Sequence, residues 1–124
     1  MNLLLDSYPY LELLDPSPKA DRVKELVSSA DRVYTTILNL YEVKYRVTQR
    51  DSAETADAFI STIKTTNQVL GMDEETAMAA SEIKLANPKM GAVDCMTLAC
   101  ARKYGLTVVT GDPDFPKDND VIFL

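Results

Sequence analysis

The sequence has no histidine and no tryptophan among its 124 residues, and it has only two cysteines. Without an imidazole, the chain cannot form a Ser-His-Asp or Cys-His nucleophile system, or a zinc or iron site with histidine ligands. Catalysis by this chain is therefore expected to depend on carboxylates. Cys95 and Cys100 fall in one predicted helix, too far apart for a disulfide, and we expect both to be buried thiols.

The chain also lacks a long apolar run and an excess of positive charge. No segment approaches the roughly 18 apolar residues of a membrane span, and the N-terminus does not have the pattern of a signal peptide. We therefore expect a soluble, cytoplasmic protein with no membrane partner. The net charge of −6, from 19 acidic and 13 basic residues, disfavours binding to a phosphate backbone unless several acids hold divalent cations.

The length and the 46% hydrophobic content predict a single globular domain over residues 1–124. Short apolar β-type runs alternate with longer helical patterns, which favours an α/β fold with a parallel sheet. We expect strands at 3–5, 33–36, 68–70, 107–110 and 121–123, and helices at 8–14, 17–29, 38–49, 52–65, 74–85 and 92–104. Ser17 before Pro18, and Asp51 with Glu54 three residues later, are the expected helix starts.

Two of the predicted strands are followed directly by acidic residues. Asp6 follows the strand 3–5, and Asp112 and Asp114 follow the strand 107–110. Parallel strands end at the same edge of a sheet, which is where α/β proteins bind ligands. An Asp in this position is also common as a turn former or helix cap, so that structural interpretation stays open for each residue.

Two further acids lie in predicted helices that are mainly apolar. Glu42 lies at the edge of the apolar face of the helix 38–49, and Asp94 lies in the first turn of the helix 92–104. Such carboxylates are expected to face a cleft. The structural alternatives are an ion pair between Glu42 and Arg46, and a favourable placement of Asp94 at a helix N-terminus.

Together these residues resemble the PIN domains, and within them the VapC-type toxins of bacterial and archaeal toxin–antitoxin pairs. The resemblance covers the whole chain and rests on four motifs: Leu4-Leu5-Asp6-Ser7, Asn39-Leu40-Tyr41-Glu42, Ala92-Val93-Asp94 and Val108-Val109-Thr110-Gly111-Asp112-Pro113-Asp114-Phe115. It implies a three-layer α/β/α sandwich with a parallel, roughly five-stranded sheet. The sequence departs from the family at Tyr8-Pro9-Tyr10, which puts the role of Ser7 in question.

The resemblance also implies which residues form the site. The expected acidic quartet is Asp6, Glu42, Asp94 and Asp112, with Asp114 as an accessory acid and Ser7 and Thr110 as supporting hydroxyls. Four carboxylates in one pocket repel one another, and cations make such a pocket tolerable. Mg²⁺ and Mn²⁺ prefer hard oxygen ligands, and they promote phosphodiester hydrolysis without histidine.

The expected function is therefore that of an endoribonuclease dependent on Mg²⁺ or Mn²⁺, in which a metal-activated water attacks phosphorus. Asp6, Asp94 and Asp112 would be the principal ligands, while Glu42 would bind a second ion or orient the water. The resemblance implies an RNA substrate, a small antitoxin protein as partner, and a homodimer.

Basic and aromatic residues near these acids each have two interpretations. Lys44, Arg46, Arg102 and Lys103 could hold flanking phosphates, although solvated helix surfaces usually carry such charges. Tyr8, Tyr10, Tyr41 and Tyr45 could stack on RNA bases, or pack in the core or at a dimer interface.

Two rival functions remain at this stage. The first is a catalytically silent PIN-like module that binds RNA or protein, which the presence of all four acids disfavours. The second is a phosphoacceptor receiver domain, which requires an Asp at the end of the third strand and a Lys after a late strand. Here the third strand ends at Gly71, and no lysine follows Val109-Thr110.

Overall fold

The computed structural model describes residues 1–124. Its elements are, in order, β1 (Asn2–Leu5), α1 (Ser7–Glu12), α2 (Pro18–Ser29), β2 (Arg32–Thr36), α3 (Ile37–Arg50), α4 (Ala53–Thr66), β3 (Gln68–Leu70), α5 (Glu74–Ala86), α6 (Ala92–Tyr104), β4 (Thr107–Thr110) and β5 (Val121–Phe123). Every predicted strand and helix is confirmed, with ends shifted by no more than one or two residues. No helix combines the length and the apolar character that crossing a membrane would require.

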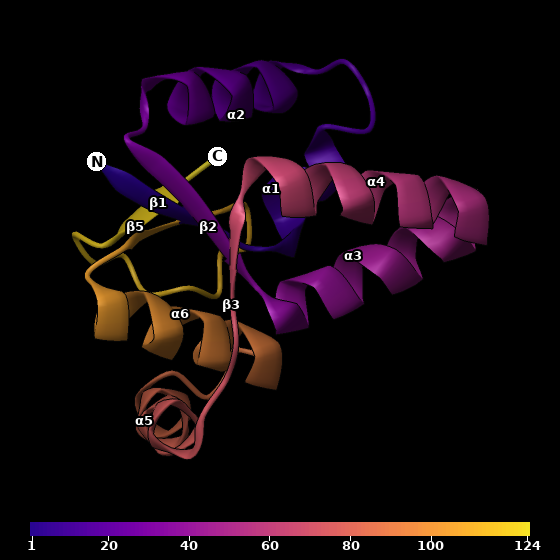
Figure 1. Ribbon diagram of the computed structural model, residues 1–124. Coiled ribbons are helices and arrows are strands. Elements are labelled where there is room, and N and C mark those ends of the chain that lie inside the picture. Colours follow the sequence, from indigo (N-terminus) through magenta and orange to yellow (C-terminus); the bar gives the residue numbers. More distant parts are fainter.

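The five strands form one parallel sheet in the order β3-β2-β1-β4-β5. Helices α1 to α4 pack on one face of this sheet, and α5 and α6 pack on the other, which confirms the predicted three-layer α/β/α arrangement (Figure 1). The strand order reverses at β1, where β2 and β4 are its two neighbours. Leu5 pairs with Val109, so the carboxyl ends of β1 and β4 lie side by side.

The central strands are buried on both faces, as parallel strands covered by helices must be. Leu3, Leu5 and Val109 belong to the apolar cluster beneath α1 to α4. Leu4 and Val108 belong to the second cluster, beneath α5 and α6. This alternation follows from the two-residue period of a strand. The rigid core therefore fixes the edge at which β1 and β4 end.

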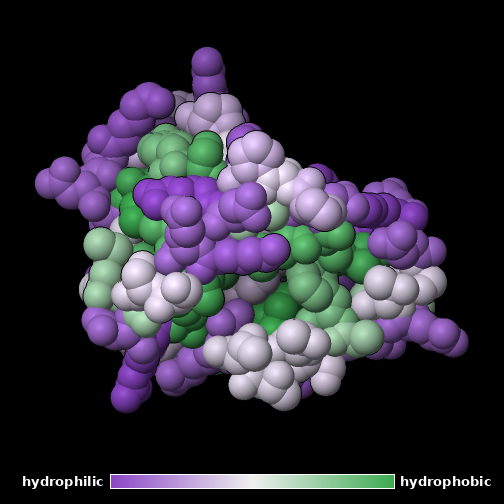
Figure 2. Space-filling model, turned by 90° about the horizontal axis from the view of Figure 1, so that it is seen from above, coloured by the Kyte–Doolittle hydropathy of each residue, from purple (hydrophilic) through white to green (hydrophobic).

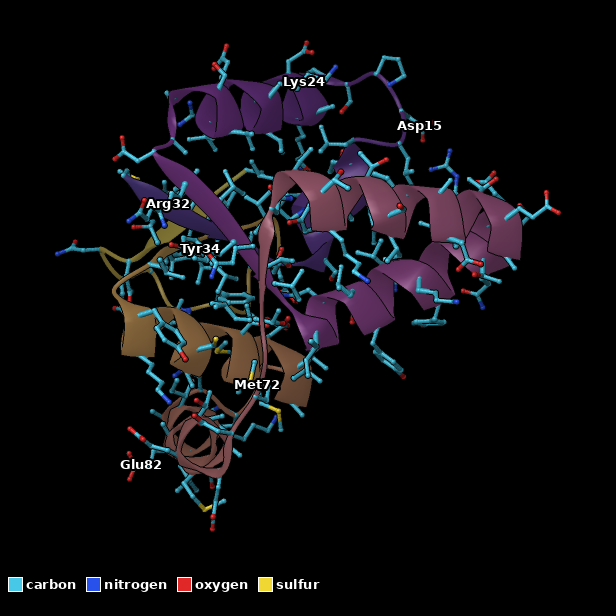
Figure 3. All side chains as sticks on the ribbon, in the orientation of Figure 1. Asp15, Lys24, Arg32, Tyr34, Met72 and Glu82 are labelled. Atoms are coloured by element: carbon cyan, nitrogen blue, oxygen red, sulfur yellow. The ribbon has the colours of Figure 1, made fainter.

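The side-chain view shows the same separation of interior and surface. Tyr34 and Met72 pack against the cluster beneath α5 and α6, whereas Lys24 and Glu82 project from the outer sides of α2 and α5 (Figure 3). Figure 2 looks onto the side that carries α2 and α4, where hydrophilic ridges leave apolar side chains visible between them. Cys95 and Cys100 are buried free thiols, as expected.

The helix starts are partly as predicted. Ser17 begins α2 by accepting a hydrogen bond from the backbone N–H of Ala20 at 3.0 Å. The expected start at Asp51 is wrong, because Ser52 caps α4 instead. The N–H of Asp51 still bonds to the carbonyl of Val47 at 2.8 Å, so Asp51 ends α3 and cannot also begin the next helix.

Candidate functional site

Asp6 is the most buried of the five acids predicted from sequence, with only 2% of its surface exposed. It ends β1 and caps α1, and its Oδ1 accepts a hydrogen bond from the Tyr8 N–H at 3.1 Å. The pKa of Asp6 is raised to about 8, mainly by burial and also by the charges of Asp94 and Glu42, while hydrogen bonds from Thr110 and Tyr8 act to lower it. The structural role as a cap is therefore real, but it does not explain why a carboxylate is buried beside two others.

Thr110 connects the ends of β1 and β4. Its side chain is fully buried, bonds to the carboxylate of Asp6, and accepts the backbone N–H of Asp112 at 3.0 Å. Asp112 in turn accepts the N–H of Asp114 at 2.8 Å, which is the turn-forming role that the sequence left open. The Thr110 hydroxyl therefore sets the position of Asp112 relative to Asp6.

Glu42 lies in the second turn of α3 and is half-buried. Ser7 donates a hydrogen bond from its Oγ to Oε1 of Glu42, although the two residues are 35 positions apart in the chain. The ion pair between Glu42 and Arg46 that sequence reasoning left open does not form. Ser7 is therefore part of the site, and Pro9 is accommodated within the first turn of α1.

Asp94 lies in the first turn of α6, where it is not the helix cap, since that position is held by Gly91. The pKa of Asp94 is raised to about 7, mainly by burial and also by a hydrogen bond to Asp112 and by the charges of Asp112, Glu42 and Asp114. The charges of the other predicted acids thus act on Asp6 and Asp94: Asp94 and Glu42 on Asp6, and Asp112, Glu42 and Asp114 on Asp94. This juxtaposition is what the order of the strands predicts.

Sequence reasoning missed a buried polar network beneath these carboxylates. Asn39 is 1% exposed and contacts the carbonyl of Leu5 through Nδ2 at 3.5 Å, and its Oδ1 accepts the Thr97 hydroxyl at 3.3 Å. Thr35 donates to the same carbonyl at 2.9 Å. The network ties α3 and α6 to the end of β1, which orients the helices that carry Glu42 and Asp94. An Asn within an apolar helix face was the available signal.

The neighbouring bases and tyrosines largely have structural roles. Lys44 forms an ion pair with Asp57, and Lys103 forms one with Asp73. Arg102 pairs with both Asp118 and Asp120, whereas Arg46 forms no ion pair. Tyr10 is buried in the core, and Tyr41 and Tyr45 are exposed on α3 with their ring centroids 6.2 Å apart. Of the four tyrosines, Tyr8 alone contacts residues of the carboxylate site directly.

The side chains at the site offer the oxygen donors that hard divalent cations prefer, but they are not already arranged to coordinate one. No group of three or more Asp, Glu, His or Cys side chains is arranged closely enough to hold a metal ion. Glu42 is turned toward Ser7, and Asp112 toward the N–H of Asp114. All the donors are nonetheless carboxylate oxygens, and none of the five acids has a Lys or Arg partner in an ion pair.

Comparisons with solved structures show where this fold occurs. A toxin–antitoxin complex from Klebsiella pneumoniae aligns with a TM-score of 0.78 at 16% identity, over 97% of this chain and 95% of the other. VapBC2 from Rickettsia felis, bound to a promoter DNA fragment, aligns with a TM-score of 0.76 at 14% identity, over 100% and 98%. VapC20 from Mycobacterium tuberculosis, a toxin that cleaves the sarcin-ricin loop, aligns with a TM-score of 0.74 at 19% identity, over 86% of both chains.

The sequence comparison is more specific than these structural likenesses. No curated protein matches the chain in sequence. The profile described as PIN domain matches residues 3–119, which includes all five acids and every helix and strand except β5 and the first residue of β1. The chain therefore belongs to the PIN-domain family.

Proposed function

We propose that this protein is an endoribonuclease that depends on Mg²⁺ or Mn²⁺ and acts as a single PIN domain, like the VapC toxins. The observation that carries the proposal is the set of five carboxylates from the ends of β1 and β4 and from α3 and α6, none of which forms an ion pair with a Lys or Arg. Raised pKa values of about 8 for Asp6 and about 7 for Asp94 are what uncompensated carboxylates produce. A helix-capping role alone does not require a carboxylate to be buried beside other carboxylates.

The side chains divide into ligands and supports. Asp6, Asp94 and Asp112 would hold the cation, with Glu42 and Asp114 at the margin of the site. The bound ion would supply positive charge at the scissile phosphate and lower the pKa of a water molecule. Ser7 would orient Glu42 through its hydroxyl, and Thr110 would orient Asp6 and Asp112. Glu42 would accept a hydrogen bond from the attacking water.

An RNA substrate is supported by one of the structural neighbours, VapC20, which is a toxin that cleaves the sarcin-ricin loop. The test is end-mapped cleavage of total tRNA and ribosomal RNA in Mn²⁺, with EDTA as the control. We expect cleavage products in Mn²⁺ and none in EDTA. Binding of the same RNA without cleavage in Mn²⁺ or Mg²⁺ would reject the enzyme and favour a catalytically silent RNA-binding module.

We also propose a small antitoxin partner, since neighbours of this fold are toxin–antitoxin complexes. We place this protein in the cytoplasm, where it would encounter both the antitoxin and RNA. The assay is co-expression of the chain with the small protein encoded beside it. We expect a stable complex that no longer cleaves RNA, and co-expressed proteins that separate on purification would contradict this partner.

A homodimer is the remaining part of the proposal. Ile37, Tyr41 and Tyr45 form an exposed apolar stripe along α3, with 48%, 65% and 47% of their surfaces exposed. Their spacing of four residues places them on one helix face, which a second copy would cover. Light scattering should give twice the 13.7 kDa of one chain, and a 13.7 kDa species at micromolar concentration would contradict it.

A further inference from the structure

Lys19 is a cation beside the carboxylate site that has no acidic partner. It lies in the first turn of α2, where Ser17 as the cap and Pro18 as the first residue fix the start of the helix. Its Nζ donates a hydrogen bond to the Tyr8 hydroxyl at 2.9 Å and lies 5.2 Å from the centre of the Tyr8 ring. Lys19 forms no ion pair, although the protein has more acids than bases.

Tyr8 places this lysine against the site. Its backbone N–H bonds to Asp6, and the preceding residue, Ser7, bonds to Glu42. Its ring packs on Gly111, immediately before Asp112, so closely that a Cβ at position 111 would lie 2.1 Å from a ring carbon. Only glycine permits this approach. The tyrosine ring therefore lies between the ends of β1 and β4.

This arrangement leaves one face of the ring on the Gly111 backbone and the ammonium of Lys19 over the ring. The face of the Tyr8 ring on Gly111 is therefore unavailable to an RNA base. The phenol instead holds the ammonium through a hydrogen bond and a cation–π contact. Lys19 itself stays exposed, with donors left for another ligand.

An RNA substrate must bring its phosphates to an edge that carries five acids, so a cation at that edge is needed to hold the neighbouring phosphate. Three of the four bases expected for this task from sequence, Lys44, Arg102 and Lys103, are already paired with acids. The fourth, Arg46, forms no ion pair, and Lys19 differs from it in being held by Tyr8, whose backbone N–H bonds to Asp6. We propose that Lys19 binds an RNA phosphate next to the scissile one, and that Tyr8 is the positioning residue that holds Lys19 there. This inference rests on the proposed ribonuclease function.

The inference also accounts for the departure of this sequence from the family at position 8. A tyrosine there requires glycine at position 111 and supplies the phenol that Lys19 contacts. Tyr8, Lys19 and Gly111 thus form one cluster of contacts. Neither the Lys19 ammonium nor the Tyr8 hydroxyl is a metal ligand in the proposal, so Lys19→Gln and Tyr8→Phe should leave the response to metal unchanged.

The test measures the affinity of single-stranded RNA for the full chain at a fixed low Mg²⁺ concentration while NaCl is varied. Asp94→Asn serves as the background, so that cleavage does not consume the RNA. The variants are Lys19→Gln, Lys19→Arg and Tyr8→Phe. Lys24→Gln is the matched control, because Lys24 lies on the same helix, has no ion pair and projects from the outer side of α2 (Figure 3).

We expect Lys19→Gln to weaken binding about fivefold at low salt and to reduce the slope of log K against log salt by about 0.7, the value for one lost phosphate contact on single-stranded nucleic acid. Lys19→Arg should restore both quantities. Tyr8→Phe keeps the ring on Gly111 and removes the hydroxyl, so it should weaken binding about twofold without changing the melting temperature. In the cleaving protein, Lys19→Gln should raise KM and leave kcat nearly unchanged.

Two outcomes would overturn the inference. The first is a Lys19→Gln variant whose affinity and salt slope equal those of Lys24→Gln. The second is a Tyr8→Phe variant that binds RNA as tightly as the unchanged protein, which would remove the positioning role. If the unchanged protein cleaves RNA and these results are obtained, the inference fails alone. If the unchanged protein neither binds nor cleaves RNA, the proposed function fails with it.

Discussion

The two ends of α6 lie near acidic groups in opposite surroundings. At the C-terminal end, Arg102 contacts Asp118 and Asp120, each at 2.8 Å, and Lys103 contacts Asp73. At the N-terminal end, Asp94 adjoins other carboxylates and no Lys or Arg forms an ion pair with any of them. One helix thus separates a region of matched charges from a region of unmatched ones.

The pKa shifts of the acids in these two regions have opposite directions. Hydrogen bonds from Lys103 and Thr76 hold the pKa of Asp73 well below its usual range. Burial and neighbouring acids raise the pKa of Asp94 to about 7 and that of Asp6 to about 8. Matched charges stabilise the fold modestly, whereas unmatched buried carboxylates oppose it. The unmatched region is therefore the one that an external cation would relieve.

The largest difference between the two ends should be in activity. Asp94→Asn removes a ligand charge while keeping the shape of the side chain, so RNA cleavage should fall by at least about a hundredfold. Asp118→Asn, at the other end of α6, should leave cleavage unchanged. Initial rates on the same labelled RNA in Mn²⁺ provide the measurement. Near-normal rates for Asp94→Asn would remove this residue from the site. Asp6→Asn and Asp112→Asn should behave as Asp94→Asn does.

The second difference is in how stability depends on pH without metal. Asp6 has a folded-state pKa of about 8 and an unfolded value of about 3.9, so the native state binds more protons between these pH values. Stability in EDTA should therefore decrease as pH rises from about 4 to about 8. Asp6→Asn removes this charge and keeps an acceptor for the Tyr8 N–H. We expect the variant to be more stable at pH 8 by about 1–3 kcal/mol and to show a flatter profile in urea unfolding.

A variant profile that parallels that of the unchanged protein across pH 4 to 8 would contradict the account of Asp6. Asn also retains the role of helix cap, so a loss of stability at every pH would indicate damage to packing and not a change in charge. The comparison between the two profiles therefore isolates the carboxylate.

The smallest effect is expected at the matched end, and its sign is opposite. Asp73 has a lowered folded-state pKa, so its contribution to stability is present above the unfolded pKa and is lost as pH falls through the folded value. Asp73→Asn should lower the melting temperature slightly near neutral pH, while Asn still caps α5 through the Thr76 N–H. The difference should shrink in high salt and below about pH 4. An increase in melting temperature at pH 7 would refute this interpretation.

The sequence predicted the elements of the fold well because their signals are local. The apolar run of β1 and the glycine after α6 are recognisable without tertiary information; the structure confirms the strand and gives Gly105 a φ of 65°. Asp51 was misassigned because the capping pattern cannot show that the preceding helix extends to the same residue.

The site residues that follow strand ends could be predicted from the sequence, whereas the side-chain contacts between distant segments could not. The acids Asp6 and Asp112 could be placed at one edge of the sheet because each follows a strand of a predicted parallel sheet. The bond from Ser7 to Glu42 and the close packing of Tyr8 on Gly111 could not, since each joins distant segments whose separation only the folded chain defines. The same holds for Lys103, whose pairing with Asp73 makes it unavailable to a phosphate.

The central claim is that the unmatched acids bind a divalent cation, and a thermal melt tests it most directly. Native-state binding at a hundredfold excess over Kd stabilises a fold by about 2.7 kcal/mol. The account predicts that millimolar Mn²⁺ raises the melting temperature by several degrees over the EDTA control, with a smaller rise for Asp94→Asn and an unchanged rise for Asp118→Asn. A melt in Mn²⁺ that coincides with the EDTA control would show that these carboxylates do not form a metal site.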